Sequence, residues 1–185
     1  MSSSKHIILG VSASIALHRA LDIGSELRKG GHKVSVLMSP NAKQLISPLA
    51  FQAMTLSKVY HQMWETVSDL DHDHIRLAQD ADLMVLAPAT AGTIGKIANG
   101  IADNILTTTA MTFDGPRLFA PAMNWRMWAN EAVQANTQLL QNRAWELISP
   151  ADGDLACGET GPGRLAEVSF ILDRIEAAWS RPKKA

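Results

Sequence analysis

The sequence is short of cysteine, because Cys157 is the only one among 185 residues. A single cysteine excludes an intramolecular disulfide framework and is typical of a reducing compartment. Charge of one sign is not in excess either, since 17 Lys and Arg against 18 Asp and Glu leave a formal net charge of -1. This balance provides no general electrostatic attraction for nucleic acid or for an anionic membrane surface.

Long apolar runs are also missing. No run approaches the roughly 20 residues that cross a bilayer. The first residues, MSSSK, lead directly into a strand-like segment without a signal-peptide pattern. Hydrophobic residues make up 46% and charged residues 19% of the chain, which is a globular composition. We therefore expect a cytoplasmic protein with a single domain over residues 1–185, long enough to bury its own core.

Short apolar segments alternate along the chain with helical patterns. Strands are expected at 6–11, 33–38, 83–87, 117–120 and 145–148, and helices over 15–29, from 39–41 onward, over 93–109 and over 167–179. This alternation predicts a parallel sheet covered on both faces, an α/β, Rossmann-like (flavodoxin-like) three-layer sandwich. Ligands of such sheets bind at the carboxyl ends of the strands. The segments expected to line that edge are 12–15, 39–41, 88–93 and 121–124.

Two of these segments offer a place for a phosphate group. The turn GVSASIA at 10–16 lacks the full G-x-G-x-x-G fingerprint, but it presents small residues, hydroxyls and backbone N–H groups at a helix start. Ser39 occupies the same place after the second strand. Two helix starts side by side suit one phosphomonoester better than a pyrophosphate. Simple N-capping by these hydroxyls is the alternative.

The two later segments have unusual compositions. PATAGT at 88–93 is made of small residues, which would let a planar ligand approach the backbone, although a close helix–sheet contact needs the same residues. PAMNWRMW at 121–128 places two methionines and two tryptophans around Asn124 at a strand end, which is unusual for a surface turn.

A metal site is a weaker interpretation of the sequence. His72 and His74 would share one face of a strand at i, i+2, but spacing supplies no third or fourth ligand, so no metal is predicted. A lone cysteine is more often an inert buried residue. The glycines around Cys157 and the lack of any helix or strand pattern there favour a place in an active site, on a mobile flap.

Together these segments resemble the flavin-containing cysteine decarboxylase family. The family's PASANT motif corresponds to 88–93, and PxMNxxMW is matched at every defined position by 121–128. The H-I-x-L element falls on 74–77, and A-C-G-x-x-G-x-G-R is matched by 156–164. The similarity runs from about residue 5 to residue 175. One departure is Gly92, which stands where PASANT has its asparagine.

The resemblance implies FMN as the cofactor. By position, the residues that would hold it are Ala13, Ser14, Ile15, Ser39, Thr90, Ala91, Gly92, Thr93 and Met123. The implied reaction is decarboxylation of 4'-phosphopantothenoylcysteine to 4'-phosphopantetheine in coenzyme A biosynthesis, a lyase reaction. It would proceed through thiol oxidation, loss of CO2 and reduction of the ene-thiol.

Three residues would be catalytic by the same resemblance. His74 would act as the acid/base group, Asn124 would hydrogen-bond the substrate, and Cys157 would donate a proton in the reductive half. Ala156 and Arg164 would complete the substrate site, with Arg164 pairing with a substrate anion.

Other functions stay open at this stage. The main alternatives are oxidative decarboxylation of a peptide's C-terminal cysteine and a non-catalytic, regulatory flavoprotein. A flavin prenyltransferase of the same fold is disfavoured by the intact motif at 121–128. The resemblance further implies a homotrimer or homododecamer with the flavin at a subunit boundary. A separate phosphopantothenoylcysteine synthetase would be a partner, and no nucleic acid or membrane partner is expected.

Overall fold

The protein is described by a computed structural model that covers residues 4–63, 73–154, 156 and 158–179. Within this part of the chain, six parallel strands form one sheet in the order β3-β2-β1-β4-β5-β6. The strands are β1 (His6–Val11), β2 (Lys33–Met38), β3 (Val59–Tyr60), β4 (Leu83–Ala89), β5 (Arg117–Pro121) and β6 (Trp145–Leu147). This is the Rossmann order, in which the direction of strand addition reverses between β1 and β4. The predicted fold class is confirmed.

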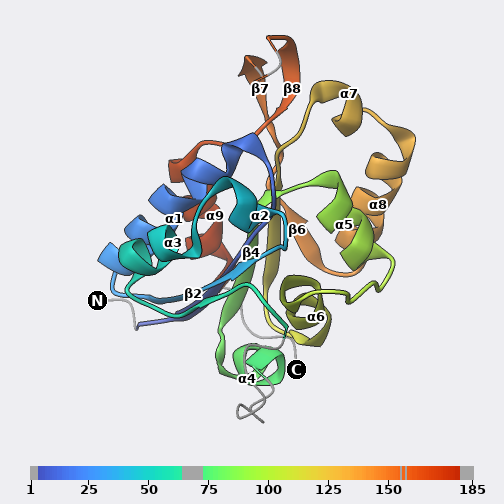
Figure 1. Ribbon diagram of the computed structural model, residues 1–185. Coiled ribbons are helices and arrows are strands. Elements are labelled where there is room, and N and C mark those ends of the chain that lie inside the picture. The colour runs from blue at the N-terminus through green and yellow to red at the C-terminus, as the bar shows by residue number, and fades with distance from the viewer. Residues whose placement is uncertain (1–3, 64–72, 155, 157, 180–185) are drawn as a thin grey trace.

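Helices cover both faces of the sheet (Figure 1). The first face carries α1 (His18–Lys29), α3 (Pro48–Thr55) and α9 (Val168–Trp179), and the second carries α4 (Asp73–Asp80), α5 (Ala91–Ala98), α6 (Ile105–Thr112) and α8 (Glu131–Asn142). Three short helices lie at loops: the 3-10 helix η1 (Ile15–Leu17), α2 (Ala42–Leu45) and α7 (Trp125–Trp128).

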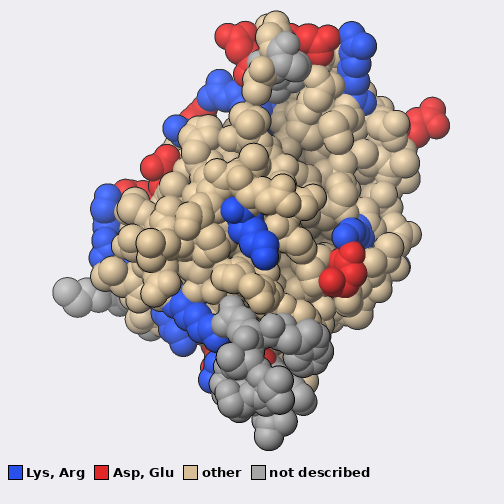
Figure 2. Space-filling model, in the orientation of Figure 1, with Lys and Arg blue, Asp and Glu red and all other residues tan. Residues whose placement is uncertain are grey.

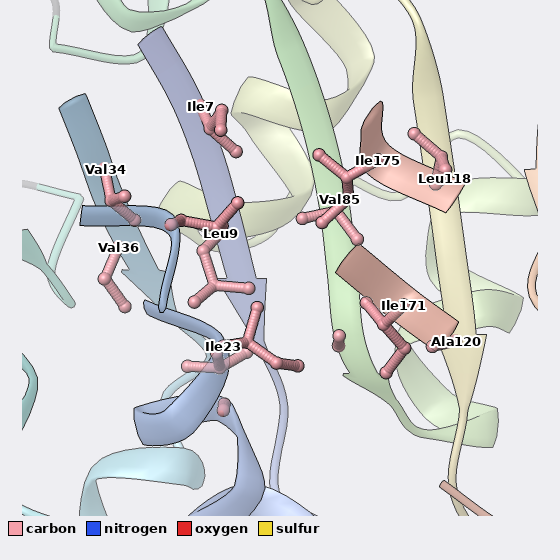
Figure 3. Close-up of a cluster of buried hydrophobic side chains, with 14 of the residues drawn as sticks. Ile7, Leu9, Ile23, Val34, Val36, Val85, Leu118, Ala120, Ile171 and Ile175 are labelled. Atoms are coloured by element: carbon pink, nitrogen blue, oxygen red, sulfur yellow. The ribbon is translucent and has the colours of Figure 1, made fainter. Parts of the chain in front are cut away.

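Alternate residues of each strand enter different cores. Ile7 and Leu9 of β1 face the core that α1 and α9 cover, which Figure 3 shows with Ile23 and Ile171. Ile8 points to the opposite core, under α5 and α6. The side chains of Ile7, Ile8 and Leu9 are all fully buried. A strand that is covered on both sides needs apolar residues at every position, which explains the continuous apolar run of β1.

Two predicted helices differ in the structure. The expected helix over 93–109 is interrupted after α5, where Gly100 has φ +70, and the chain restarts at α6. Asn104 starts α6 with a capping box, because its side chain accepts hydrogen bonds from the backbone of Leu106 and Thr107. The helix expected from Ser39 begins only at Ala42 and lasts four residues.

The histidine-containing segment is also corrected. His74 lies in the first turn of α4 and not in a strand, so the predicted i, i+2 face is wrong. His72 lies outside the described residues. Among the described residues, no group of three His, Cys, Asp or Glu side chains could hold a metal ion.

A β-hairpin that the sequence did not suggest stands over the carboxyl edge of the sheet. It pairs β7 (Ala151–Asp154) with β8 (Thr160–Arg164) in antiparallel fashion and projects beside α7 (Figure 1). Cys157, between the two strands, lies outside the described residues. No helix in the described part of the chain is long and apolar enough to cross a membrane.

Candidate active site

The turns that follow β1 and β4 are joined by one buried hydroxyl. Ser12 is 1% exposed; its Oγ donates to the carbonyl of Pro88 at 2.7 Å and accepts from the N–H of Thr90 at 2.8 Å. The backbone N–H of Ser12 also donates to the Pro88 carbonyl, at 3.1 Å. These bonds hold two loops side by side at the point where the strand order reverses, which is where α/β sheets bind ligands.

Hydroxyls cap the helices that start at this point. Ser14 accepts from the N–H of Ala16 at 3.3 Å and begins η1. Thr90 caps α5, and its Oγ1 lies 3.1 Å from that of the buried Thr93. The N-capping alternative is therefore correct for Ser14 and wrong for Ser39, because Asn41 occupies the N-cap of α2. Capping does not compete with a ligand site, because Ser14 and Thr90 also line the cavity described next.

A cavity of about 660 Å³ opens between these turns, the start of α7 and the hairpin. It brings together eight of the predicted site residues: Ala13, Ser14, Ile15, Thr90, Met123, Asn124, Ala156 and Arg164. Lining residues that sequence reasoning did not single out include His18, Arg19, Asp154 and Glu167. They lie near helix starts or in the hairpin, and no motif marks them in the sequence.

Four predicted cofactor residues lie beside the cavity and do not line it. Ser39 donates its backbone N–H to the carbonyl of Val11 at 2.9 Å, which keeps it at the same edge of the sheet. Ala91, Gly92 and Thr93 form the first turn of α5. Gly92 is exposed, and a Cβ added there would meet no atom within 4 Å.

His74 is separated from the other predicted catalytic residue in the described chain. It lies on α4, at the end of the molecule opposite the hairpin (Figure 1), and it does not line the cavity. Asn124, in contrast, lies on the cavity wall and caps α7, its Oδ1 accepting from the N–H of Arg126 at 2.8 Å. One copy of the chain therefore does not bring His74 and Asn124 together.

Two arginines of the cavity share one carboxylate. Glu167 accepts from Arg19 at 3.3 Å and also pairs with Arg164. These three side chains are roughly half exposed. The guanidinium groups are therefore held at the cavity wall in a place that solvent and a charged ligand can reach.

The cavity fits a flavin nucleotide. Its volume lies within the range of about 300–1,000 Å³ that is typical of cofactor and ligand pockets. Ala13 and Thr90 supply small side chains beside exposed backbone at the switch point, and Ile15 and Met123 supply apolar surface for a flat ring system. The starts of η1 and α5 orient N–H groups toward this edge, as a phosphate group requires.

Comparison with known proteins gives the family. The family model described as "Flavoprotein" matches residues 1–180. The chain belongs to this flavoprotein family.

Among curated flavoprotein relatives, the probable phosphopantothenoylcysteine decarboxylase of Streptococcus mutans is 42% identical over 94% of this chain and 98% of its own length. The coenzyme A biosynthesis bifunctional protein CoaBC of Bacillus subtilis is 39% identical over 100% of this chain, which spans only 46% of that relative. A solved PPC decarboxylase, a cysteine-to-serine mutant complexed with pantothenoylaminoethenethiol, superposes with a TM-score of 0.87 at 28% identity. The superposition covers 97% of this chain and 100% of that structure.

Proposed function

We propose that this flavoprotein is an FMN-dependent lyase that decarboxylates 4'-phosphopantothenoylcysteine to 4'-phosphopantetheine, a step of coenzyme A biosynthesis. The observation that carries the proposal is the single cavity that joins Ala13–Ile15, Thr90, Asn124 and Arg164, which are far apart in the sequence. The activities named for relatives that match 94% and 100% of this chain support it.

We assign one set of polar groups in the cavity to FMN and a second set to the substrate. Ser14, Thr90 and the neighbouring helix starts would hold the phosphate and ribityl parts of FMN, with Ser39 beside them. When bound, FMN supplies an acceptor for the two electrons removed from the substrate thiol and returns them to the ene-thiol. Asn124 would hydrogen-bond the substrate carboxylate, and Ala156 would contact the substrate from the hairpin.

Arg164 and Arg19 would recognise the substrate's anionic end. In the structure the single carboxylate of Glu167 pairs with both guanidinium groups. A substrate phosphate could replace this exposed carboxylate with little loss, because exposed ion pairs contribute only about 0–1 kcal/mol. A peptide C-terminus lacks that phosphate, so this pair of arginines favours the coenzyme A precursor over a peptide substrate.

We further infer that the site is completed between copies of the chain in a homotrimer, with His74 reaching the cavity of a neighbouring copy. The distance between α4 and the hairpin within one chain supports this arrangement (Figure 1). The face that carries α2, α5 and α6 has few charged side chains (Figure 2). Leu45 of α2 and Met111 of α6 are 50% and 53% exposed. Few charges together with exposed apolar side chains are typical of subunit interfaces.

The decisive experiment is an absorbance spectrum followed by turnover. The purified protein should be yellow, or become yellow with added FMN, and should convert 4'-phosphopantothenoylcysteine to 4'-phosphopantetheine and CO2, as mass analysis of the product would show. A protein that takes up no flavin would contradict the proposal. Accumulation of an aminoenethiol by the unmodified protein would favour the peptide-type oxidative reaction, and flavin binding without any product would favour a regulatory role.

A further inference from the structure

The carboxylate of Glu159 gathers three hydrogen bonds from one short segment. Its Oε2 accepts from Asn124 Nδ2 at 3.1 Å and from the indole Nε1 of Trp125 at 2.9 Å. Its Oε1 accepts from Arg126 at 3.0 Å. A carboxylate has only acceptor sites, so all three groups must present N–H donors to it.

This pattern determines the orientation of the Asn124 amide. The nitrogen of that amide faces Glu159, and its oxygen accepts from the N–H of Arg126 at 2.8 Å. A flipped amide would place an oxygen against a carboxylate oxygen and a nitrogen against a backbone N–H. Both contacts would be repulsive, so Glu159 and the cap of α7 together select one of the two amide orientations.

Glu159 also belongs to a row of contacts between the hairpin and this segment. Gly163 accepts from the N–H of Met123 at 2.9 Å, and a Cβ on Gly163 would lie 2.3 Å from the carbonyl oxygen of Met123. A Cβ on Gly161 would lie 3.0 Å from that of Trp125. Residues 159, 161 and 163 follow the two-residue period of an extended chain, so one side of the chain at β8 packs directly on 123–126.

We infer that Glu159 is a positioning residue for the reaction: it holds the Asn124 amide in its working orientation and couples that orientation to the docked hairpin. The inference rests on the proposed function, in which Asn124 binds the substrate. Glu159 occupies a variable position of the A-C-G-x-x-G-x-G-R motif, so the sequence does not single it out. Its contribution arises from geometry and acceptor chemistry and not from its net charge, because the pair with Arg126 is solvent-exposed.

Two variants distinguish the effect of the hydrogen bonds that Glu159 accepts from the effect of its negative charge. Glu159→Ala removes every acceptor, and because a misplaced reacting group can cost on the order of 100-fold, we expect kcat to fall about 10- to 100-fold with a smaller change in KM. Glu159→Gln keeps one carbonyl oxygen for Asn124 and Trp125 and loses only the exposed pair with Arg126. Its kcat should stay within about fivefold of the unmodified protein. Asp152→Ala is the matched control, since it removes an exposed carboxylate from the same hairpin without touching the cavity.

A second readout does not depend on turnover. In ¹⁵N-labelled, FMN-loaded protein, the indole N–H signal of Trp125 (assigned by its loss in Trp125→Phe) and the side-chain amide signals of Asn124 should move in Glu159→Ala and not in Asp152→Ala. Unmoved signals would overturn the inference whether or not the protein is active. The inference would also be overturned if Glu159→Ala raised KM and left kcat unchanged. That result would mean that Glu159 only holds the hairpin in place and does not orient Asn124 for the reaction. If the unmodified protein forms no product while these signals move, the proposed function fails and the control of the Asn124 orientation stands.

Discussion

The hydroxyl of Ser12 lies 2.7 Å from the carbonyl oxygen of Pro88 and joins the ends of the two central strands. The same hydroxyl accepts the N–H of Thr90, so one buried side chain sets the distance between two walls of the cavity. The turn at 10–16 and the segment at 88–93 are therefore held together as one structural unit.

Ser12→Ala should weaken both the fold and the cofactor site. It leaves the part-buried N–H of Thr90 without its acceptor, and the cost is at most that of a fully buried unsatisfied donor, about 1–3 kcal/mol. We expect the free energy of unfolding in urea to fall by up to this amount and FMN to bind less tightly. Ser57→Ala, which removes a part-buried hydroxyl outside the cavity lining, should change neither quantity. Equal FMN affinity in the two variants would argue against the joint role of Ser12.

Gly163→Ala should detach the hairpin from the site. Gly163 has φ +137, and an added Cβ would collide with the carbonyl oxygen of Met123. Backbone strain of this kind costs about 1–3 kcal/mol, which is enough to displace a two-stranded hairpin. We expect faster limited proteolysis within 151–164 and a large loss of turnover. Gly92→Ala adds the same methyl group in open space and should leave the proteolysis of this segment unchanged.

A mixture of two inactive variants should regain activity if the site is shared between copies. In His74→Ala and Asn124→Ala homotrimers, every site lacks one of the two groups. In trimers reassembled from an equal mixture, about a quarter of the sites would combine an intact His74 from one copy with an intact Asn124 from another. We therefore expect about a quarter of the unmodified activity in a turnover assay after mixing. If His74 acts within its own chain, the mixture should remain inactive.

Stability should fall in mild acid because of His6. Burial, followed by the positive charge of Lys33, lowers the pKa of this imidazole, which lies 2.8 Å from the hydroxyl of Ser35. Below about 6.5, the usual pKa of histidine, the unfolded chain therefore binds more protons at this position than the folded chain does. The free energy of unfolding should decrease as the pH falls through this range and recover as it rises.

The histidine prediction is checked by urea denaturation at pH 7.5 and pH 5.5. His6→Gln, which cannot be protonated, should lose less stability between the two values than the unmodified protein. His18→Gln makes the same substitution at an exposed histidine and is the control for the exchange itself. An unchanged pH dependence in His6→Gln would contradict the assignment.

Much of the fold was predictable because its signals are local. Buried parallel strands need apolar residues at consecutive positions, so the strands at 6–11 and 33–38 were predicted with their observed bounds. The break between α5 and α6 was not, because apolar residues on both sides of Gly100 continue a helical pattern and only the packed backbone shows its positive φ. The β7–β8 hairpin carries glycines and a proline where strands usually have β-branched residues. In the structure this hairpin packs on 123–126 through Gly161 and Gly163.

By itself, the sequence determined the fold class, the edge of the sheet that binds ligands, the family resemblance and eight of the residues that line the cavity, because each follows from short segments read in order. Only the tertiary structure decided which of those segments meet. It separated His74 from Asn124, paired Arg19 and Arg164 through Glu167, and placed Glu159 against the Asn124 amide. Contacts of this kind join residues that are distant along the chain. They depend on distances and directions in space that no local pattern of residues records.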